Sequence, residues 1–180
     1  MKIAICGTHC SGKSTLVDYI SKELNIPKIK EVAGRFTEEE RQNFATQLDI
    51  LQEQINEERT HVEFVSDRSV VDNCAYIYYH ASKLGLESVY NEAKKFVNNY
   101  LSKKPYDAIF FVDEYFPLVD NGVRNLDKHQ QEYVFNYLKN NIDGISNQYD
   151  IPIIHISGNT KKRMEVIKKW LTSQTPQTPQ

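Results

Sequence analysis

Short apolar runs alternate with longer amphipathic or charged stretches along most of the chain. The apolar runs predict strands near residues 2–6, 27–31, 62–67, 108–113 and 151–157. The stretches between them predict helices near residues 13–24, 38–61, 70–84, 86–102, 127–142 and 160–171. Alternation of strand and helix implies right-handed crossovers and a parallel sheet. We therefore expect an α/β fold in three layers, with helices on both faces of a five-stranded parallel sheet.

In a sheet of this kind, ligands bind at the carboxyl ends of the strands. The first strand is followed by Gly7-Thr8-His9-Cys10-Ser11-Gly12-Lys13-Ser14, a full match to G-x-x-x-x-G-K-[ST] between a strand and a helix. Such a loop turns its amides toward a triphosphate. Lys13 is expected at the β- and γ-phosphates, Ser14 at Mg²⁺ and Thr15 at the phosphates. The predicted nucleotide site comprises residues 7–15 of this loop. His9 and Cys10 stand at variable positions of the motif, where a side chain need have no contact with the nucleotide.

Two further strands end in a pair of charged residues. Asp67 and Arg68 follow the third strand, where the carboxylate can hold Mg²⁺ or take a proton and the guanidinium can neutralise phosphoryl charge. The simpler alternative for Asp67 is a helix cap. Glu31 and Arg35 follow the second strand, where they would bind and deprotonate an acceptor hydroxyl or form only a surface ion pair.

Asp113 and Glu114 follow the fourth strand, and four apolar residues precede them. This pattern is typical of an ATPase in which the first acid serves the metal and the second primes a water. A solvated strand end is the alternative. After it, a lid is predicted near residues 115–130, with Arg124 closing over the phosphates. A connecting loop with an exposed arginine would explain the same residues.

Several other residues are weaker candidates for binding. Gly158 and Asn159 follow the last strand, where they would contact a nucleotide base or cap the final helix. Gln54 shares a helical stripe with Gln47 and Glu58 that would read a base or face solvent. The aromatic run at 76–80 indicates core packing or a subunit contact in a homodimer.

Composition narrows the class of protein. The chain has 180 residues and a formal net charge of −2, which suits one domain, predicted over residues 1–171 with a disordered tail at 172–180. The charge gives no basic footprint for nonspecific nucleic-acid binding. No apolar run is long enough to cross a bilayer, and the start of the chain has no signal segment. With only three cysteines, a cytoplasmic location is expected.

Together these motifs resemble the P-loop kinases of nucleosides and nucleotides, in the AAA-like branch that includes ribosylnicotinamide kinase domains and phage nucleotide kinases. The resemblance spans nearly all of residues 1–171. It implies a P-loop NTPase fold with strand order 2-3-1-4-5, with ATP and Mg²⁺ as cofactors. It also implies Glu31 as general base, Asp67 near Mg²⁺, Arg68 on the phosphates, and a substrate site that includes Asp72, although Glu31 and Asp67 exchange roles in other kinases of the superfamily.

The leading functional hypothesis is a Mg²⁺- and ATP-dependent transfer of the γ-phosphoryl group to a small nucleoside or nucleotide-like acceptor. Its expected catalytic residues are Lys13, Glu31, Asp67, Arg68 and Arg124, and its expected substrate-binding residues are Glu31, Arg35, Gln54 and Asp72. One alternative is an ATPase or nucleotide-dependent switch that uses Asp113 and Glu114. Another is a kinase that acts on a hydroxyl of modified DNA or RNA.

Overall fold

The computed structural model describes residues 1–114 and 128–174. In chain order its elements are β1 (Lys2–Cys6), α1 (Lys13–Leu24), β2 (Lys28–Ile29), the 3₁₀ helix η1 (Val32–Arg35), α2 (Glu38–Arg41), α3 (Phe44–Arg59), β3 (Phe64–Asp67), α4 (Val70–Leu84), α5 (Glu87–Leu101), β4 (Ala108–Val112), α6 (Lys128–Tyr149), β5 (Ile153–Ile156) and α7 (Thr160–Gln174).

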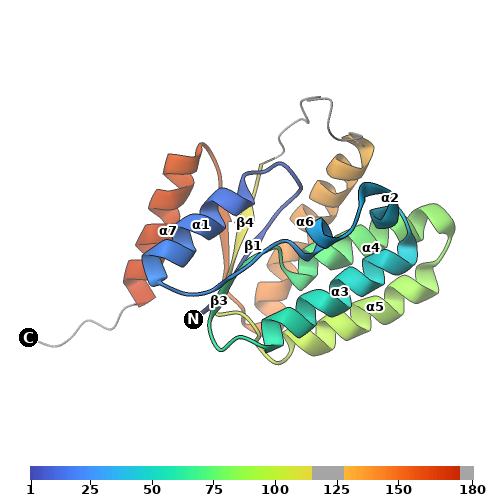
Figure 1. Ribbon diagram of the computed structural model, residues 1–180, viewed down its shortest axis with the longest axis horizontal. Helices are drawn as coiled ribbons and strands as arrows, with labels where there is room; N and C mark the ends of the chain where they lie inside the picture. Colours follow the sequence, from blue (N-terminus) through green and yellow to red (C-terminus); the bar gives the residue numbers. More distant parts are fainter. Residues whose placement is uncertain (115–127, 175–180) are drawn as a thin grey trace, which may run out of the picture.

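The strands form one sheet in the order β2-β3-β1-β4-β5, and every pairing between neighbours is parallel. Figure 1 shows α1 and α7 together on one side of the sheet, with α3, α4, α5 and α6 on the other. The predicted three-layer fold and its strand order 2-3-1-4-5 are therefore confirmed. Since β1 lies in the middle, the loop that follows it opens at the centre of the sheet's carboxyl edge.

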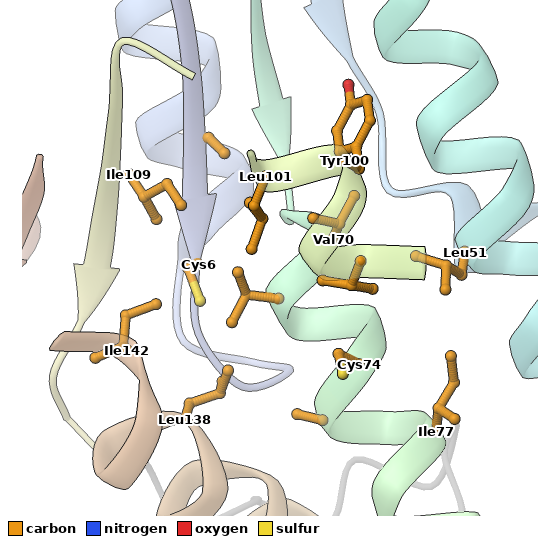
Figure 2. Packing of buried hydrophobic residues seen from close by; sticks show 14 of the residues in the cluster. Cys6, Leu51, Val70, Cys74, Ile77, Tyr100, Leu101, Ile109, Leu138 and Ile142 are labelled. Atoms are coloured by element: carbon orange, nitrogen blue, oxygen red, sulfur yellow. The ribbon is translucent and has the colours of Figure 1, made fainter. Parts of the chain in front are cut away.

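The side chains of β1 alternate between two hydrophobic cores. Ile3 and Ile5 pack with residues of α1 and α7, whereas Ala4 and Cys6 pack with residues of α4 and α6. Successive strand residues point to opposite faces, so a continuous apolar run can fill both cores. Figure 2 shows Cys6 in the larger core, between the sheet and these helices. Both faces of the central strand are thus fully buried, which fixes the base of the loop after it.

The predicted helix over residues 38–61 is interrupted and forms two helices, α2 and α3. Thr37 caps α2 in a capping box with Glu40, and the side-chain oxygen of Asn43 accepts a hydrogen bond from Ala45 N to cap α3. Asparagine competes with helical hydrogen bonding in this way, which is why it favours caps over helix interiors. The break turns the short helix α2 away from the axis of α3.

The other differences from the predicted bounds concern where helices α6 and α7 and strand β2 end. α6 continues past Gly144 to Tyr149, because Ile145 and Tyr149 pack against the core and offset the glycine. α7 runs to Gln174, three residues into the predicted tail. β2 is limited to Lys28–Ile29, since the chain then turns into η1. Within the described residues, no helix is both long and apolar enough to span a membrane.

Candidate active site

The loop between β1 and α1 has a backbone shape that depends on its two glycines. Gly7 has a φ of 152°, and a Cβ there would lie 3.1 Å from the Val112 side chain. Gly12 has a φ of 83° and is the N-cap of α1, which has neither a side-chain cap nor an acid in its first turn. Uncapped N–H groups and the positive end of the helix dipole favour a bound anion.

Four carbonyl groups of this loop accept hydrogen bonds from side chains of the protein. The donors are Arg68 Nη1 to Gly7 O at 3.4 Å, Lys13 Nζ to Thr8 O at 2.5 Å, Gln131 Nε2 to His9 O at 3.0 Å and Arg163 Nη1 to Ser11 O at 2.6 Å. In a trans peptide the C=O and the following N–H point in opposite directions. The amides that follow the carbonyls of His9 and Ser11 therefore point away from Gln131 and Arg163, which is the orientation that a phosphate cradle requires.

Lys13 lies inside this cradle and is 5 % exposed. Its Nζ also approaches Ser11 Oγ at 3.4 Å. Burial lowers the pKa of Lys13 from its ordinary value, and the positive charge of Arg68 lowers it further, while Asp67, Asp72 and Glu31 act in the opposite direction. An ammonium that is poorly solvated and already held by a carbonyl is well placed to meet phosphate oxygens.

Ser14 and Asp67 are brought together, as the sequence predicts. Ser14 Oγ donates to Asp67 Oδ2 at 2.5 Å, which joins the first turn of α1 to the end of β3. Asp67 Oδ1 is buried and has no hydrogen-bond partner among residues 1–114 and 128–174. A hydroxyl and a carboxylate with a spare oxygen are hard ligands of the type that Mg²⁺ prefers. The pair therefore fits the predicted metal site.

Glu31 and Arg68 also meet, although 37 residues separate them. Arg68 Nε donates to Glu31 Oε1 at 2.6 Å. The Arg68 charge holds the pKa of Glu31 at about 2, far below its usual range, against the effect of burial. Arg68 has a φ of 101°, a strained backbone for a residue with a side chain, and its N–H donates to Ile5 O. The hydrogen bonds to Glu31 and to Gly7 O hold the guanidinium between Glu31 and the loop.

Tyr76 fixes the other side of Arg68. Its ring centre lies 4.9 Å from the guanidinium carbon, within the range of a cation–π contact. Its hydroxyl lies 3.0 Å from His9 Nδ1 in the loop. The sequence assigned the aromatic run to core packing or a subunit contact, and core packing is confirmed, since Tyr79 is buried in the core and Tyr76 packs against it. Tyr76 also lines a pocket, which the sequence did not indicate.

A pocket of about 170 Å³ opens next to these groups, and we call it the Arg68 pocket. Its walls come from the loop, the chain after β2, and helices α2, α3, α4 and α6. They comprise His9, Glu31, Ala33, Gly34, Glu38, Arg41, Gln42, Gln47, Ile50, Arg68, Asn73, Tyr76 and Gln130. Asn73 is 3 % exposed, and its Nδ2 has no hydrogen-bond partner in the part of the chain that the structure describes. The pocket is therefore lined by two acidic residues, two arginines and an unused amide donor.

Asp72 does not lie in the predicted substrate site but binds the backbone of the phosphate-binding loop. It is fully buried, and its Oδ1 accepts from Gly7 N at 2.8 Å. Its Oδ2 accepts from Ser69 N and Ser69 Oγ in a capping box that begins α4. Both oxygens are thus used within the protein. Asp72 does not line the Arg68 pocket, whereas its neighbour Asn73 does.

Gln54 and Arg35 also lie away from the pocket. Gln54 is 1 % exposed and donates to Glu58 Oε1 and Ser66 Oγ, both at 2.8 Å, in a buried network that α3 shares with β3. Arg35 forms the surface ion pairs that were its alternative, with Glu53 at 3.3 Å and Glu57 at 3.0 Å. Both side chains are committed to other parts of the protein, so neither belongs to the group of residues around Arg68.

Glu114 contacts both Gly158 and Arg163, a residue that the sequence analysis missed. Arg163 Nη2 donates to Glu114 Oε2 at 2.8 Å, and Gly158 N donates to Glu114 Oε1 at 2.7 Å. Asn159 caps α7 by accepting from Lys162 N. A signal existed, since Arg163 stands in line with the buried Ile167 and Leu171 at a spacing of four, where a charge on an apolar stripe is unusual.

The other residues predicted for the site lie on the loop, in the first turn of α1 and after β4. Ser14 and Thr15 are exposed in the first turn of α1, Thr8 is buried, and Cys10 is exposed with a φ of 60°. Asp113 lies 3.1 Å from both Lys139 Nζ and His155 Nδ1. Arg124 and most of the predicted lid lie outside the described residues, while residues 128–130 begin α6.

Solved structures with the same fold include two kinds of nucleotide-binding protein. A deoxyadenosine kinase from M. mycoides with bound dCTP matches with a TM-score of 0.70 and 20% identity, over 96% of this chain and 100% of that one. The NadR protein in complex with NR matches with a TM-score of 0.68 and 13% identity, over 98% of this chain and 52% of NadR, so this chain spans about half of NadR. These likenesses confirm the P-loop kinase fold.

Among curated proteins no match was found. A family model described as AAA domain matches residues 2–163, from β1 to the arginine in α7 that holds the loop. This range takes in the loop, the Arg68 pocket and the whole sheet. The chain therefore belongs to the AAA domain family.

Proposed function

We propose that this protein is a kinase that transfers the γ-phosphoryl group of ATP to a hydroxyl of a small nucleoside-like acceptor. The observation that carries the proposal is the position of the Arg68 pocket, whose wall includes both His9 of the phosphate-binding loop and the carboxylate of Glu31. A pocket that shares a wall with a triphosphate cradle can bring an acceptor hydroxyl to the γ-phosphate. Positioning of this kind supplies much of the rate in phosphoryl transfer.

Glu31 is the group that faces the acceptor in this proposal. It lines the Arg68 pocket, whereas Asp67 does not and is hydrogen bonded to Ser14 instead. This difference favours Glu31 over Asp67 as the proton acceptor. The oxygen of the acceptor forms a bond to the γ-phosphorus as the bond to the β-phosphate oxygen breaks, and the hydroxyl proton passes to Glu31. The Arg68 charge holds the pKa of Glu31 at about 2, so this carboxylate is ionised and can accept a hydrogen bond from the acceptor hydroxyl.

Asp67 and Ser14 are the residues proposed to hold Mg²⁺. When bound, the ion would neutralise charge on the β- and γ-phosphates. Arg68 contacts both Glu31 and the carbonyl of Gly7, so its charge lies between the acceptor and the loop. Lys13 adds a second positive charge inside the cradle. The proposed site thus has separate residues for nucleotide, metal and acceptor.

A nucleoside-like acceptor is supported by the mixed character of the pocket. Gln47, Asn73 and Tyr76 offer hydrogen-bonding groups, and Ile50 offers an apolar surface against which a flat ring can pack. The structure with a similar fold and bound dCTP is a deoxyadenosine kinase. We therefore favour a nucleoside over an unrelated alcohol.

The ATPase alternative loses support from the contacts of Glu114. An acid that primes a water must orient a lone pair toward that water, and hydrogen bonds to protein groups compete for its lone pairs. Both oxygens of Glu114 accept hydrogen bonds, one from Gly158 and the other from Arg163. Asp113 lies beside Lys139 and His155. These two acids therefore resemble structural anchors more than a hydrolytic pair.

The test is a phosphate-transfer screen with γ-labelled ATP and Mg²⁺. Ribonucleosides, deoxyribonucleosides, nicotinamide riboside and their monophosphates would be offered one at a time, with single-stranded DNA and RNA as separate arms. We expect label in one class of nucleoside product and little free phosphate. Release of phosphate at the same rate with and without every acceptor would contradict the proposal, and label only in DNA or RNA would favour the polynucleotide alternative.

Variants sharpen this screen. Glu31→Gln keeps the shape of the side chain but removes the charge, and we expect a loss of turnover of about 100-fold or more. Glu165→Gln, an exposed carboxylate on α7, is the matched control and should leave turnover unchanged.

A further inference from the structure

We infer that Arg163 is a positioning residue for ATP, which holds the phosphate-binding loop and the loop after β5 in a single arrangement. The inference deepens the proposed function and rests on it, because it concerns the nucleotide that the kinase would use. It gives a role to a buried charge that the loop motif itself does not contain.

The first part of this arrangement is the contact of Arg163 with the phosphate-binding loop. Arg163 Nη1 donates to Ser11 O at 2.6 Å, across 152 residues of sequence, and the same nitrogen would lie 3.6 Å from a Cβ on Gly12. The Ser11–Gly12 peptide is trans, so a carbonyl turned toward α7 turns the Gly12 N–H to the opposite side. Arg163 thereby orients one of the amides that the phosphate cradle needs.

The second part is the contact of Arg163 with Glu114. Glu114 follows β4 closely. One oxygen of its carboxylate accepts a hydrogen bond from Arg163, and the other accepts from Gly158 N. Gly158 follows β5, where the sequence predicts the contact with a nucleotide base. One guanidinium therefore connects the phosphate side of the predicted nucleotide site with its base side, through a single intervening carboxylate.

A purely structural role would not require this residue. α7 is already anchored by Ile167, which is fully buried, and by Leu171. Replacing both members of a buried ion pair with apolar side chains is often neutral or stabilising for a fold. The Glu114 side chain is 31 % exposed, so the loss of Arg163 leaves its partner in contact with solvent rather than buried and unpaired. Arg163 is 4 % exposed, and burying its charge costs desolvation energy that an apolar side chain would not. Its hydrogen bond to Ser11 O gives this charge a role in orienting the loop.

The experiment compares wild type with Arg163→Met, Arg163→Lys and Lys168→Met. Lys168 is an exposed cation on the same helix and serves as the matched control. ATP affinity would be measured by calorimetry with Mg²⁺, folding by thermal unfolding, and KM for ATP and for the acceptor by steady-state kinetics. We expect Arg163→Met to weaken ATP binding by about tenfold or more while the protein stays folded. KM for ATP should rise in step, and KM for the acceptor should stay within about twofold, because the Arg68 pocket has no residue from α7.

The lysine variant keeps the test informative if the methionine variant folds poorly. A lysine is a point charge that can satisfy one partner but not both, so its ATP affinity should lie between those of wild type and Arg163→Met. Folded Arg163→Met or Arg163→Lys with wild-type ATP affinity would overturn the inference, as would a loss in kcat with both KM values unchanged. If wild type itself bound no ATP, the proposed function would fall, which is a distinct result.

Glu114→Gln adds an independent check, since it weakens the partner of Arg163 without touching the phosphate-binding loop. The combined variant with Arg163→Met should lose less ATP affinity than the sum of the two single losses, because each removes the same ion pair. Strict additivity would show that the two residues act separately and would also overturn the inference.

Discussion

The hydroxyl of Ser14 lies 2.5 Å from Oδ2 of Asp67, so the first turn of α1 is bonded to the end of β3. This contact spans the edge of the sheet at which the phosphate-binding loop opens. It leaves the buried Oδ1 of Asp67 without a partner among the described residues.

Asp67→Asn is expected to raise the Mg²⁺ concentration that gives half-maximal turnover by about tenfold or more, because an amide is a weaker ligand than a carboxylate. Ser14→Ala should act in the same direction with a smaller effect. The measurement is a Mg²⁺ titration of phosphoryl transfer. Ser21→Ala, which removes a hydroxyl on the same helix, should leave the titration unchanged.

Tyr76→Ala is expected to raise KM for the acceptor by about tenfold, because Arg68 loses the ring that holds its guanidinium against Glu31. Tyr76→Phe keeps the ring and loses only the hydroxyl contact with His9, so its effect should be smaller. Steady-state kinetics of both variants would decide this. Equal effects would indicate that the hydroxyl, and not the ring, is the important group.

Glu58 should make folding stability depend on pH. It is 1 % exposed, and burial raises its pKa to about 7, although Gln54, Tyr100 and Tyr106 hydrogen bond to it. Since the unfolded pKa is near 4.3, the folded state binds the proton more tightly. The contribution of Glu58 is therefore full below about pH 4 and is lost as the pH rises toward 7, by on the order of 3 kcal/mol.

Chemical unfolding of wild type and Glu58→Gln between pH 5 and pH 7.5 tests this dependence. The difference in unfolding free energy should shift steadily in favour of the variant as the pH rises. The comparison isolates Glu58 from His155, whose pKa is raised by Asp143 and Asp113 against the effect of burial, because His155 is present in both proteins. Glu23→Gln, on the surface of α1, should give parallel curves.

Gly144→Ala should stabilise the protein by about 0.5–1 kcal/mol. Gly144 lies inside α6, and a Cβ there would have no atom within 4 Å. Thermal unfolding would measure the gain. At Gly12 the same substitution places a side chain at a φ of 83°, so it should destabilise the protein.

The sequence predicted the parallel sheet and most helices from apolar periodicity, whereas the strand order was implied by the resemblance to P-loop kinases. It also grouped Ser14 with Asp67, since residues at the carboxyl ends of neighbouring parallel strands meet at one edge. The contact of Glu31 with Arg68 was not predicted, because the sequence analysis paired Glu31 with Arg35 of the same segment. The edge at which strands end predicts which residues lie near one another, but not which of them form a bond.

The direction of helical side chains was harder to predict. Asp72 and Asn73 are adjacent in sequence, yet the capping box turns the first toward Gly7 and leaves the second in the Arg68 pocket. Gln54 lies on the same helix as Gln47, but its side chain is turned toward β3 and donates a hydrogen bond to Ser66. These outcomes depend on how α3 and α4 sit against the sheet, which the local pattern of residues does not contain.

The carbonyls of the phosphate-binding loop are held from β3–α4, from α1 itself, from α6 and from α7. Eight residues of motif therefore do not define the binding loop by themselves. A chain with the same motif but without partners such as Gln131 and Arg163 would lack two of the hydrogen bonds that orient the loop's carbonyls. In this chain, the last helix is therefore part of the phosphate-binding loop's support, although Arg163 lies 152 residues from Ser11 in sequence.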